Sequence, residues 1–190
     1  METTEKIVDS YCRYVKKWFT IPNIKCKGQY EIDLLATDPS SGNGLKRYHI
    51  ESGVSISGVY SKLTANLFST DRLKIRVKQA GQRRTLGYFV QRKFGSPEVL
   101  RELGEYGFKP GNYEKVIVTW GWTKEARQEA EKAGVILWDF RNVLRNIAEA
   151  CGNKETYFTD DTLRTIQLFM KSSVETKSRG HIANLSAVNS

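Results

Sequence analysis

The sequence contains 190 residues, which is enough for one domain with a sizeable buried core. Apolar residues make up 39% of it and charged residues 27%, which excludes a disordered chain. It has neither an apolar run of about 18 residues, as a membrane span requires, nor the basic-then-apolar start of a signal peptide. Its three cysteines are far apart, which excludes a disulfide framework or a zinc signature and favours a reducing cytosol. We therefore expect a cytoplasmic protein that does not enter a membrane.

The positive charge is concentrated in one segment. The formal net charge is +9, and residues 71–93 carry eight basic residues against one acid, which leaves only +2 for the rest of the chain. A concentrated basic segment predicts a polyanionic partner, although the pattern is also typical of a face that only keeps a protein soluble. The residues that we predict to bind nucleic acid are Lys74, Arg76, Lys78, Arg83, Arg84, Arg92 and Lys93.

The first predicted elements are a helix and a β-hairpin. Apolar residues at helical spacing predict a helix over residues 3–19, which Pro22 ends. Alternating apolar residues predict one strand over residues 28–36 and another over residues 47–53. The turn residues at 38–44 separate these two strands and favour an antiparallel hairpin.

This hairpin is expected to bring two acids together. If Leu35 pairs with His49, Asp33 lies opposite Glu51 on the same face, with Cβ atoms about 5 Å apart. Two carboxylates at this distance repel each other unless a positive charge lies between them, and a divalent cation would supply it. Carboxylate oxygens are ligands that Mg²⁺ and Mn²⁺ prefer, so Asp33 and Glu51 are the predicted metal ligands. The alternative is that both acids are exposed and paired with basic neighbours on their strands.

The rest of the chain predicts a basic insertion followed by a βαβα unit. The insertion spans about 54–95 and contains predicted strands at 73–78 and 85–90. The later elements are a helix from Pro97 to about Gly104, a strand over 115–120, a helix over 123–133, a strand over 135–140, and helices over 142–150 and 159–171. Together they predict one α/β domain over residues 1–171, with a mixed sheet flanked by helices. Residues 172–190 are predicted to form a loose tail.

Two stretches of the sequence resemble a known family. The run Gly28-Gln29-Tyr30-Glu31-Ile32-Asp33-Leu34-Leu35-Ala36, followed by a turn and an apolar strand that carries an acid, resembles the core of the PD-(D/E)XK nuclease superfamily. Residues 118–126 and 134–138 are similar to the closing βαβ unit of its Mrr-like branch. The resemblance implies a restriction-endonuclease-like fold and an endonuclease that hydrolyses DNA phosphodiester bonds with Mg²⁺ (or Mn²⁺).

The resemblance also implies roles for individual residues. It assigns Asp33 and Glu51 to the two catalytic acids of the family, and Glu5 to an acid sometimes found on the first helix. It implies double-stranded DNA as the partner, and it allows a homodimer, because many relatives cut both strands as dimers. Independently of the family, Glu5 or Asp9 is a candidate to complete the ligands of the cation through water.

The chain departs from the family at the motif lysine, where it has Gly53. In the family this lysine positions or activates the attacking water and stabilises developing negative charge. Three explanations are open. The lysine has moved, with Lys62 or Lys93 as the candidates and Lys62 as the one that we predict to be catalytic; or the glycine leaves room for another group, such as Arg92; or the site is degenerate.

Three functions therefore follow from the sequence. We favour a metal-dependent endonuclease, and the alternatives are a degenerate nuclease fold that binds nucleic acid without cutting it and an interaction protein whose basic segment binds an acidic partner. His49 is predicted to share a face with Glu51. It is either a proton carrier or a phosphate or metal contact, or, as we prefer, a hydrogen-bonded structural residue.

Overall fold

The computed structural model describes residues 2–40, 42, 44–54, 62–68, 84–152 and 157–172. Its centre is a five-stranded sheet in the order β1-β2-β3-β4-β5. The strands are β1 (Phe19–Lys25), β2 (Glu31–Asp38), β3 (Lys46–Ser52), β4 (Glu114–Thr119) and β5 (Val135–Asp139). β1, β2 and β3 are antiparallel neighbours, whereas β3, β4 and β5 run parallel. The predicted α/β class with a mixed sheet is confirmed.

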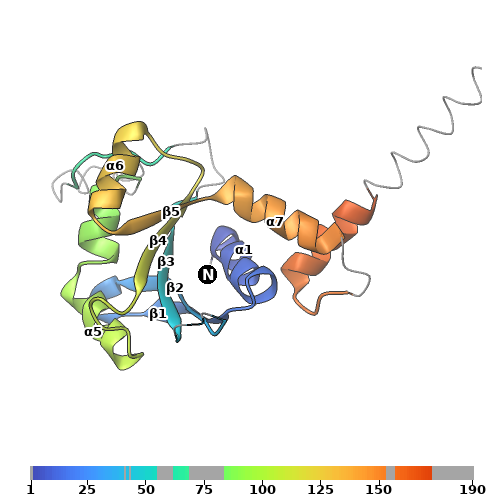
Figure 1. Ribbon diagram of the computed structural model, residues 1–190, viewed down its shortest axis with the longest axis horizontal. Coiled ribbons are helices and arrows are strands. Elements are labelled where there is room, and N and C mark those ends of the chain that lie inside the picture. The colour runs from blue at the N-terminus through green and yellow to red at the C-terminus, as the bar shows by residue number, and fades with distance from the viewer. Residues whose placement is uncertain are drawn as a thin grey trace, which may run out of the picture.

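Helices cover both faces of this sheet (Figure 1). α1 (Thr3–Ser10) and α7 (Phe140–Gly152) lie on one face, whereas α5 (Pro97–Glu105) and α6 (Lys124–Lys132) lie on the other. The shorter helical segments are the π-helical turn η1 (Tyr11–Val15), the 3₁₀ turn η2 (Lys27–Gln29), α4 (Leu86–Tyr88) and the π-helical turn η3 (Phe89–Lys93). Residues 161–172 are also helical. No helix among the described residues is long and apolar enough to cross a membrane.

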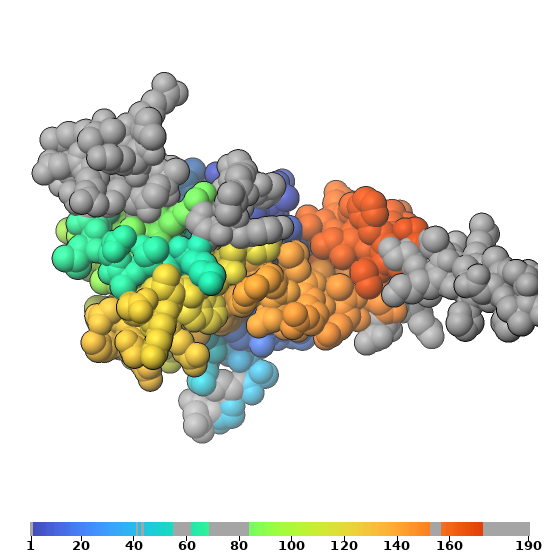
Figure 2. All heavy atoms as spheres, turned by 90° about the horizontal axis from the view of Figure 1, so that it is seen from above, coloured from blue at the N-terminus to red at the C-terminus, as the bar shows by residue number. Residues whose placement is uncertain are grey.

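The hairpin of β2 and β3 has the predicted register. Leu35 pairs with His49 and Leu34 with Ile50, so that Asp33 and Glu51 face each other just beyond the last paired residues. The turn that joins the two strands projects from the body of the molecule (Figure 2). The register matters because a shift by one residue would turn the two acids to opposite faces of the sheet.

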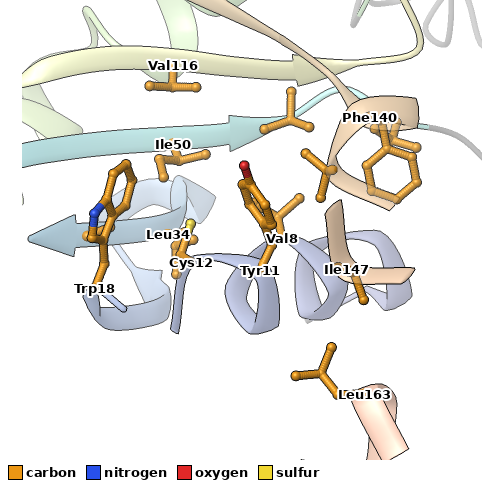
Figure 3. Packing of buried hydrophobic residues seen from close by; sticks show 14 of the residues in the cluster. Val8, Tyr11, Cys12, Trp18, Leu34, Ile50, Val116, Phe140, Ile147 and Leu163 are labelled. Atoms are coloured by element: carbon orange, nitrogen blue, oxygen red, sulfur yellow. The ribbon is translucent and has the colours of Figure 1, made fainter. Parts of the chain in front are cut away.

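The larger core lies between the sheet and the helices α1 and α7 (Figure 3). Leu34 and Ile50 project from the hairpin toward Val8 and Tyr11 of the N-terminal helical segment. The C-terminal helical segment adds Leu163 to the same cluster. Burying these side chains is the main force that fixes the hairpin against α1.

The opposite face of the sheet is covered by two smaller clusters. One joins Ile117 of β4 to Phe89 and to the small residues Ala126 and Ala130 of α6, which allow this helix to lie close to the sheet. The other joins residues of β1 and β2 to α5 and is formed by Ile24, Cys26, Ile32, Leu35, Val99, Leu103 and Phe108. Because β4 is buried on both faces, its sequence is a continuous apolar run, as in parallel sheets.

The predicted helix over residues 3–19 is wrong in its second half. α1 ends at Ser10, a π-helical turn continues to Val15, and Phe19–Lys25 forms β1. Pro22 lies inside this strand, opposite Leu34, and does not end a helix. A proline is tolerated there because β1 is an edge strand and need not donate a hydrogen bond on its outer side.

The predicted strand over residues 85–90 is also wrong, because this segment forms α4 and the start of η3. The predicted strand over residues 73–78 lies outside the described residues, as does nearly all of the predicted tail. The elements predicted from Pro97 to residue 150 are all present, with ends that differ by a few residues. All three cysteines lie in the described part of the chain, are buried, and form no disulfide with one another.

Candidate active site

Asp33 on β2 and Glu51 on β3 lie on the same side of the hairpin and are buried, with exposed fractions of 6% and 0%. The backbone N–H of Ser52 donates a hydrogen bond of 2.8 Å to Asp33 Oδ2. The backbone N–H of Asp33 lies 3.4 Å from Glu51 Oε1. Each strand therefore holds the carboxylate of its neighbour. The alternative that both acids are exposed strand residues is wrong.

Lys93 supplies a positive charge between the two acids. Its Nζ lies 2.8 Å from Asp33 Oδ1 and 2.5 Å from Glu51 Oε2, and donates a hydrogen bond of 3.1 Å to the carbonyl oxygen of Glu31. Lys93 is one of the two residues that the sequence offered for a displaced motif lysine, and the structure brings it to both acids. We refer to Asp33, Glu51, Lys93 and His49 as the Lys93 cluster.

A short helical segment carries Lys93 to this position. Thr85 begins the segment, and its Oγ1 accepts a hydrogen bond of 3.2 Å from the backbone N–H of Tyr88. The chain then makes a π-helical turn, in which the N–H of Phe94 bonds to the carbonyl of Phe89 at 2.8 Å. Residues five apart lie about 140° apart around an α-helix, so the wider turn is what brings both phenylalanines into the core. These two anchors hold Lys93 over the start of β2.

Gly53 stands where the family has its lysine, and Phe89 fills the space beside it. A Cβ atom built at Gly53 would lie 2.9 Å from Phe89 Cζ, which is closer than carbon atoms pack. The glycine therefore makes room for the segment that brings Lys93 to the acids. This agrees with the explanation that the lysine has moved.

His49 is fully buried beside Glu51. Its Nε2 lies 2.7 Å from Glu51 Oε1, and its ring meets Phe94 edge-on, with centroids 4.8 Å apart. Burial lowers the pKa of His49 to about 3, so the imidazole is neutral at pH 7. A carboxylate can only accept a hydrogen bond, so Nε2 carries the proton and donates it to Glu51. Within the described residues Nδ1 has no hydrogen-bond partner.

The charges of the Lys93 cluster depend on one another. Burial first, and then the charge of Glu51, raise the pKa of Asp33 to about 7, although Lys93 and Ser52 oppose this rise. Burial also raises the pKa of Glu51, and Lys93 again acts against it. Burial lowers the pKa of Lys93, but the two carboxylates outweigh this effect and raise it above its ordinary value. Lys93 is therefore charged at pH 7, where Asp33 gains and loses a proton readily.

The oxygen atoms of the two acids fit a Mg²⁺ ion. In proteins Mg²⁺ often binds through one or two carboxylates, and waters and substrate phosphates complete its shell. Among the residues that the structure describes, Glu51 Oε2 accepts no hydrogen bond of regular geometry. The same residues contain no group of three or more His, Cys, Asp or Glu side chains that could hold a metal. The donor set thus fits an ion whose shell is completed by waters and, when substrate is bound, by phosphate oxygens, and it does not fit a metal held by protein ligands alone.

Glu5 and Asp9 have different surroundings. Burial first, and then the charge of Asp33, raise the pKa of Glu5, so this acid lies close enough to interact with the Lys93 cluster. Its carboxylate accepts a hydrogen bond of 2.8 Å from the N–H of Glu2 and caps α1. Asp9 instead accepts a hydrogen bond of 2.6 Å from the hydroxyl of Thr20 and is not part of the cluster.

Lys62, the other candidate for the displaced lysine, is exposed and lies beside Gly121. The neighbouring Leu63 bonds to the carbonyl of Gly121, which lies beyond the end of β4, whereas Glu51 pairs with Ile117 inside that strand. The structure therefore does not bring Lys62 to the acids. No feature of the sequence distinguished Lys62 from Lys93. The path of the chain between residues 54 and 93 decides which of the two lysines lies beside Asp33 and Glu51.

The predicted nucleic-acid contacts are described only in part. Lys74, Arg76, Lys78 and Arg83 lie outside the described residues. Arg84 is half-buried before α4. Arg92 donates a hydrogen bond to the hydroxyl of Tyr30, and its guanidinium lies over that ring, 4.4 Å from the centroid. Arg92 thus borders the Lys93 cluster and does not fill the space beside Gly53.

Neither a protein-family model nor a curated protein matches this chain. Among solved structures, a crystal structure described as "Protein of Unknown Function AF1548" is similar over 91% of this chain and 98% of that chain, with a TM-score of 0.43 and 14% sequence identity.

Proposed function

We propose that this protein is a metal-dependent phosphodiesterase that cuts nucleic acid, with Asp33, Glu51 and Lys93 as its catalytic residues. The observation that carries the proposal is the convergence of these three side chains in one buried cluster, from two strands and a separate helical turn. The mixed sheet that positions the two acids, and the resemblance of residues 28–36 to the PD-(D/E)XK core, support the same activity.

Each residue has a chemical task in this proposal. Asp33 and Glu51 would hold Mg²⁺ through their carboxylate oxygens, and the ion would supply a water molecule of lowered pKa and neutralise charge on the phosphate. Lys93 orients the attacking water and stabilises the negative charge that develops on the phosphate. Its carboxylate neighbours keep it protonated, so Lys93 acts as a fixed positive charge and not as a base.

The position of the Lys93 side chain also favours a second candidate function. Its ammonium group lies between the two carboxylates, where a cation would otherwise compensate their charge. If the ammonium is a permanent counter-ion, the domain binds nucleic acid without cutting it. The two functions differ in one respect that can be measured, which is whether a divalent cation competes with Lys93 for the two acids.

Cleavage of supercoiled plasmid and of single-stranded DNA and RNA, in Mg²⁺ and in Mn²⁺, tests the first function. We expect the wild type to cut at least one of these substrates, and Asp33→Asn and Lys93→Met to reduce the rate by at least about a hundredfold. Asp38→Asn and Lys132→Met are matched controls and should leave the rate unchanged, because Lys132 is exposed and Asp38, which is half-buried, lies at the opposite end of β2 from the cluster. A wild type that cuts none of the substrates, or variants that cut at its rate, would exclude the proposed catalysis.

Binding without cutting gives a different pattern. The degenerate nuclease fold predicts that wild type and Asp33→Asn bind DNA equally and that neither cuts it. The logarithm of the binding constant should fall linearly with the logarithm of the salt concentration, because binding releases counterions from the DNA. A protein that binds no nucleic acid at low salt would exclude both functions and leave the interaction with an acidic protein.

A further inference from the structure

His49 makes a single hydrogen bond inside the described part of the molecule, and that bond goes to Glu51. The imidazole is fully buried, and its other nitrogen, Nδ1, has no partner there. A buried polar atom without a partner destabilises the folded state. A leucine or phenylalanine would fill the same core without this cost, so packing alone does not explain a histidine at this position.

The hydrogen bond of His49 separates the tasks of the two oxygens of Glu51. Oε1 accepts the bond from Nε2 at 2.7 Å, together with the longer contact of 3.4 Å from the backbone of Asp33. Oε2 is left to face Lys93 at 2.5 Å. A glutamate side chain has three rotatable bonds, and a donor fixed on one oxygen restricts all of them.

The imidazole is itself held in place. Its ring lies edge-on to Phe94, the residue that follows Lys93, and 6.3 Å from the ring of Tyr113. The phenylalanine that anchors the turn carrying the lysine thus also packs against the donor that orients the acid. One small shift of this turn would move both partners of Glu51 together.

We propose that His49 is a positioning residue, which acts by donating a hydrogen bond from Nε2 to Glu51 Oε1 and thereby directs Oε2 toward the bound cation and Lys93. This role rests on the proposed function, because it concerns the cation that Glu51 is proposed to hold. Groups that orient the ligands of a metal typically change its affinity by about 10- to 100-fold when they are removed. His49 itself touches neither the cation nor the substrate.

Nitrogen NMR of protein labelled with ¹⁵N-histidine tests the hydrogen bond without any metal or substrate. The chain has two histidines, His49 and His181, so the signals that disappear in His49→Gln identify His49. At pH 7 we expect a neutral ring with the proton on Nε2. A neutral ring with its proton on Nδ1 would overturn the proposal, because Nε2 could then not donate to Glu51.

Binding of Mn²⁺ to the full chain, measured by calorimetry without nucleic acid, tests the consequence. His49→Gln retains an amide N–H donor close to the position of Nε2 and should bind Mn²⁺ within about threefold of the wild type. His49→Asn has its donor near the position of Nδ1, and His49→Leu has none, so both should bind at least about tenfold more weakly. Should His49→Leu fail to fold, the comparison of the Gln and Asn variants decides.

The outcomes separate this inference from the function on which it rests. Equal Mn²⁺ affinities in the wild type and in His49→Asn would overturn the role of His49 and leave the proposed phosphodiesterase intact. A wild type that binds no Mn²⁺ and cuts no nucleic acid would overturn both. Weak binding by the Asn and Leu variants, together with strong binding by His49→Gln, would support the role, because a merely structural histidine would not show this order.

Discussion

Two buried acidic centres in this molecule differ in how completely their oxygens are bonded. In the first, which we call the Asp9 network, Asp9 accepts a hydrogen bond of 2.6 Å from Thr20 and forms an ion pair with Arg13 at 2.8 Å. Arg13 is partly exposed and also approaches Asp160, which caps the helix over residues 161–172. Each of these carboxylates therefore has donors from the elements that it joins.

The Lys93 cluster is arranged differently. Two carboxylates share one ammonium group, and, among the residues described, Glu51 Oε2 accepts no hydrogen bond of regular geometry. Burial and mutual repulsion raise the pKa of Asp33, the kind of perturbation that gathers at functional sites. The Asp9 network thus binds elements together, whereas in the Lys93 cluster two buried carboxylates depend on a single ammonium group. Changes in the Lys93 cluster should therefore alter activity, whereas changes in the Asp9 network should alter stability alone.

The largest expected effect is that of Lys93→Met on stability. The substitution leaves two buried carboxylates without their counter-ion, which typically costs about 3 to 5 kcal/mol at pH 7. The loss should be smaller at pH 5, because the acids then take up protons and lose their charge. Urea unfolding at both pH values measures it, and Lys132→Met, whose ion pair with Glu129 is exposed, is the control. An equal loss at both pH values would mean that the ammonium is not the counter-ion of the cluster.

The Asp9 network should separate stability from catalysis. Asp9→Asn weakens the bonds to Thr20 and Arg13 and should reduce the free energy of unfolding by about 1 to 2 kcal/mol. Nuclease activity, measured well below the unfolding temperature, should stay within about twofold of the wild type. If Asp9→Asn were as inactive as Asp33→Asn, the distinction between the two centres would fail.

The pKa of Asp33 predicts a specific dependence of stability on pH. Because its pKa rises to about 7 in the folded protein, the folded state binds the proton more tightly than the unfolded chain. The stability that Asp33 contributes is therefore fully present below about pH 4 and is lost as the pH rises through 7. From pH 5 to pH 7, the free energy of unfolding of Asp33→Asn should rise relative to that of the wild type by at most about 1.4 kcal/mol per pH unit.

Urea unfolding of both proteins between pH 5 and pH 8 measures this difference. Asp38→Asn is the matched control on the same strand. Hydrogen bonds from Ser40 lower the pKa of Asp38, so this acid is ionised over the whole range and its variant should follow the wild type in parallel. A constant difference between Asp33→Asn and the wild type would show that Asp33 does not titrate near neutral pH.

The smallest effect is expected at the border of the Lys93 cluster. Arg92→Gln loses a partly exposed contact with Tyr30 and should cost at most about 1 kcal/mol of stability. If Arg92 contacts a phosphate, the variant should bind DNA more weakly. The slope of the logarithm of the binding constant against the logarithm of the salt concentration should also become shallower by about one. The rate at saturating DNA should not change. An unchanged salt slope would remove Arg92 from the predicted nucleic-acid surface.

Several elements could have been predicted from the sequence and were not. Leu86, Phe89, Val90 and Phe94 recur at helical spacing, and Thr85 precedes them as a cap, yet the run of β-branched and aromatic residues favoured a strand. The π turn between Phe89 and Phe94 was beyond any such pattern, because it forms where both rings enter the core. Pro22 misled the prediction for a different reason. A proline is tolerated in a strand at the edge of a sheet, and the sequence does not show which strand lies at the edge.

The sequence by itself determined the register of the β2–β3 hairpin and hence the proximity of Asp33 and Glu51, because alternation and turn residues act between neighbours in the chain. It also determined the βαβ unit from Glu114 to Asp139. Only the tertiary structure decided that Lys93 compensates the two acids and that Phe94 packs against His49. These contacts join segments about 40 to 60 residues apart, and they depend on the packing of Phe89 and Phe94, which no local pattern specifies.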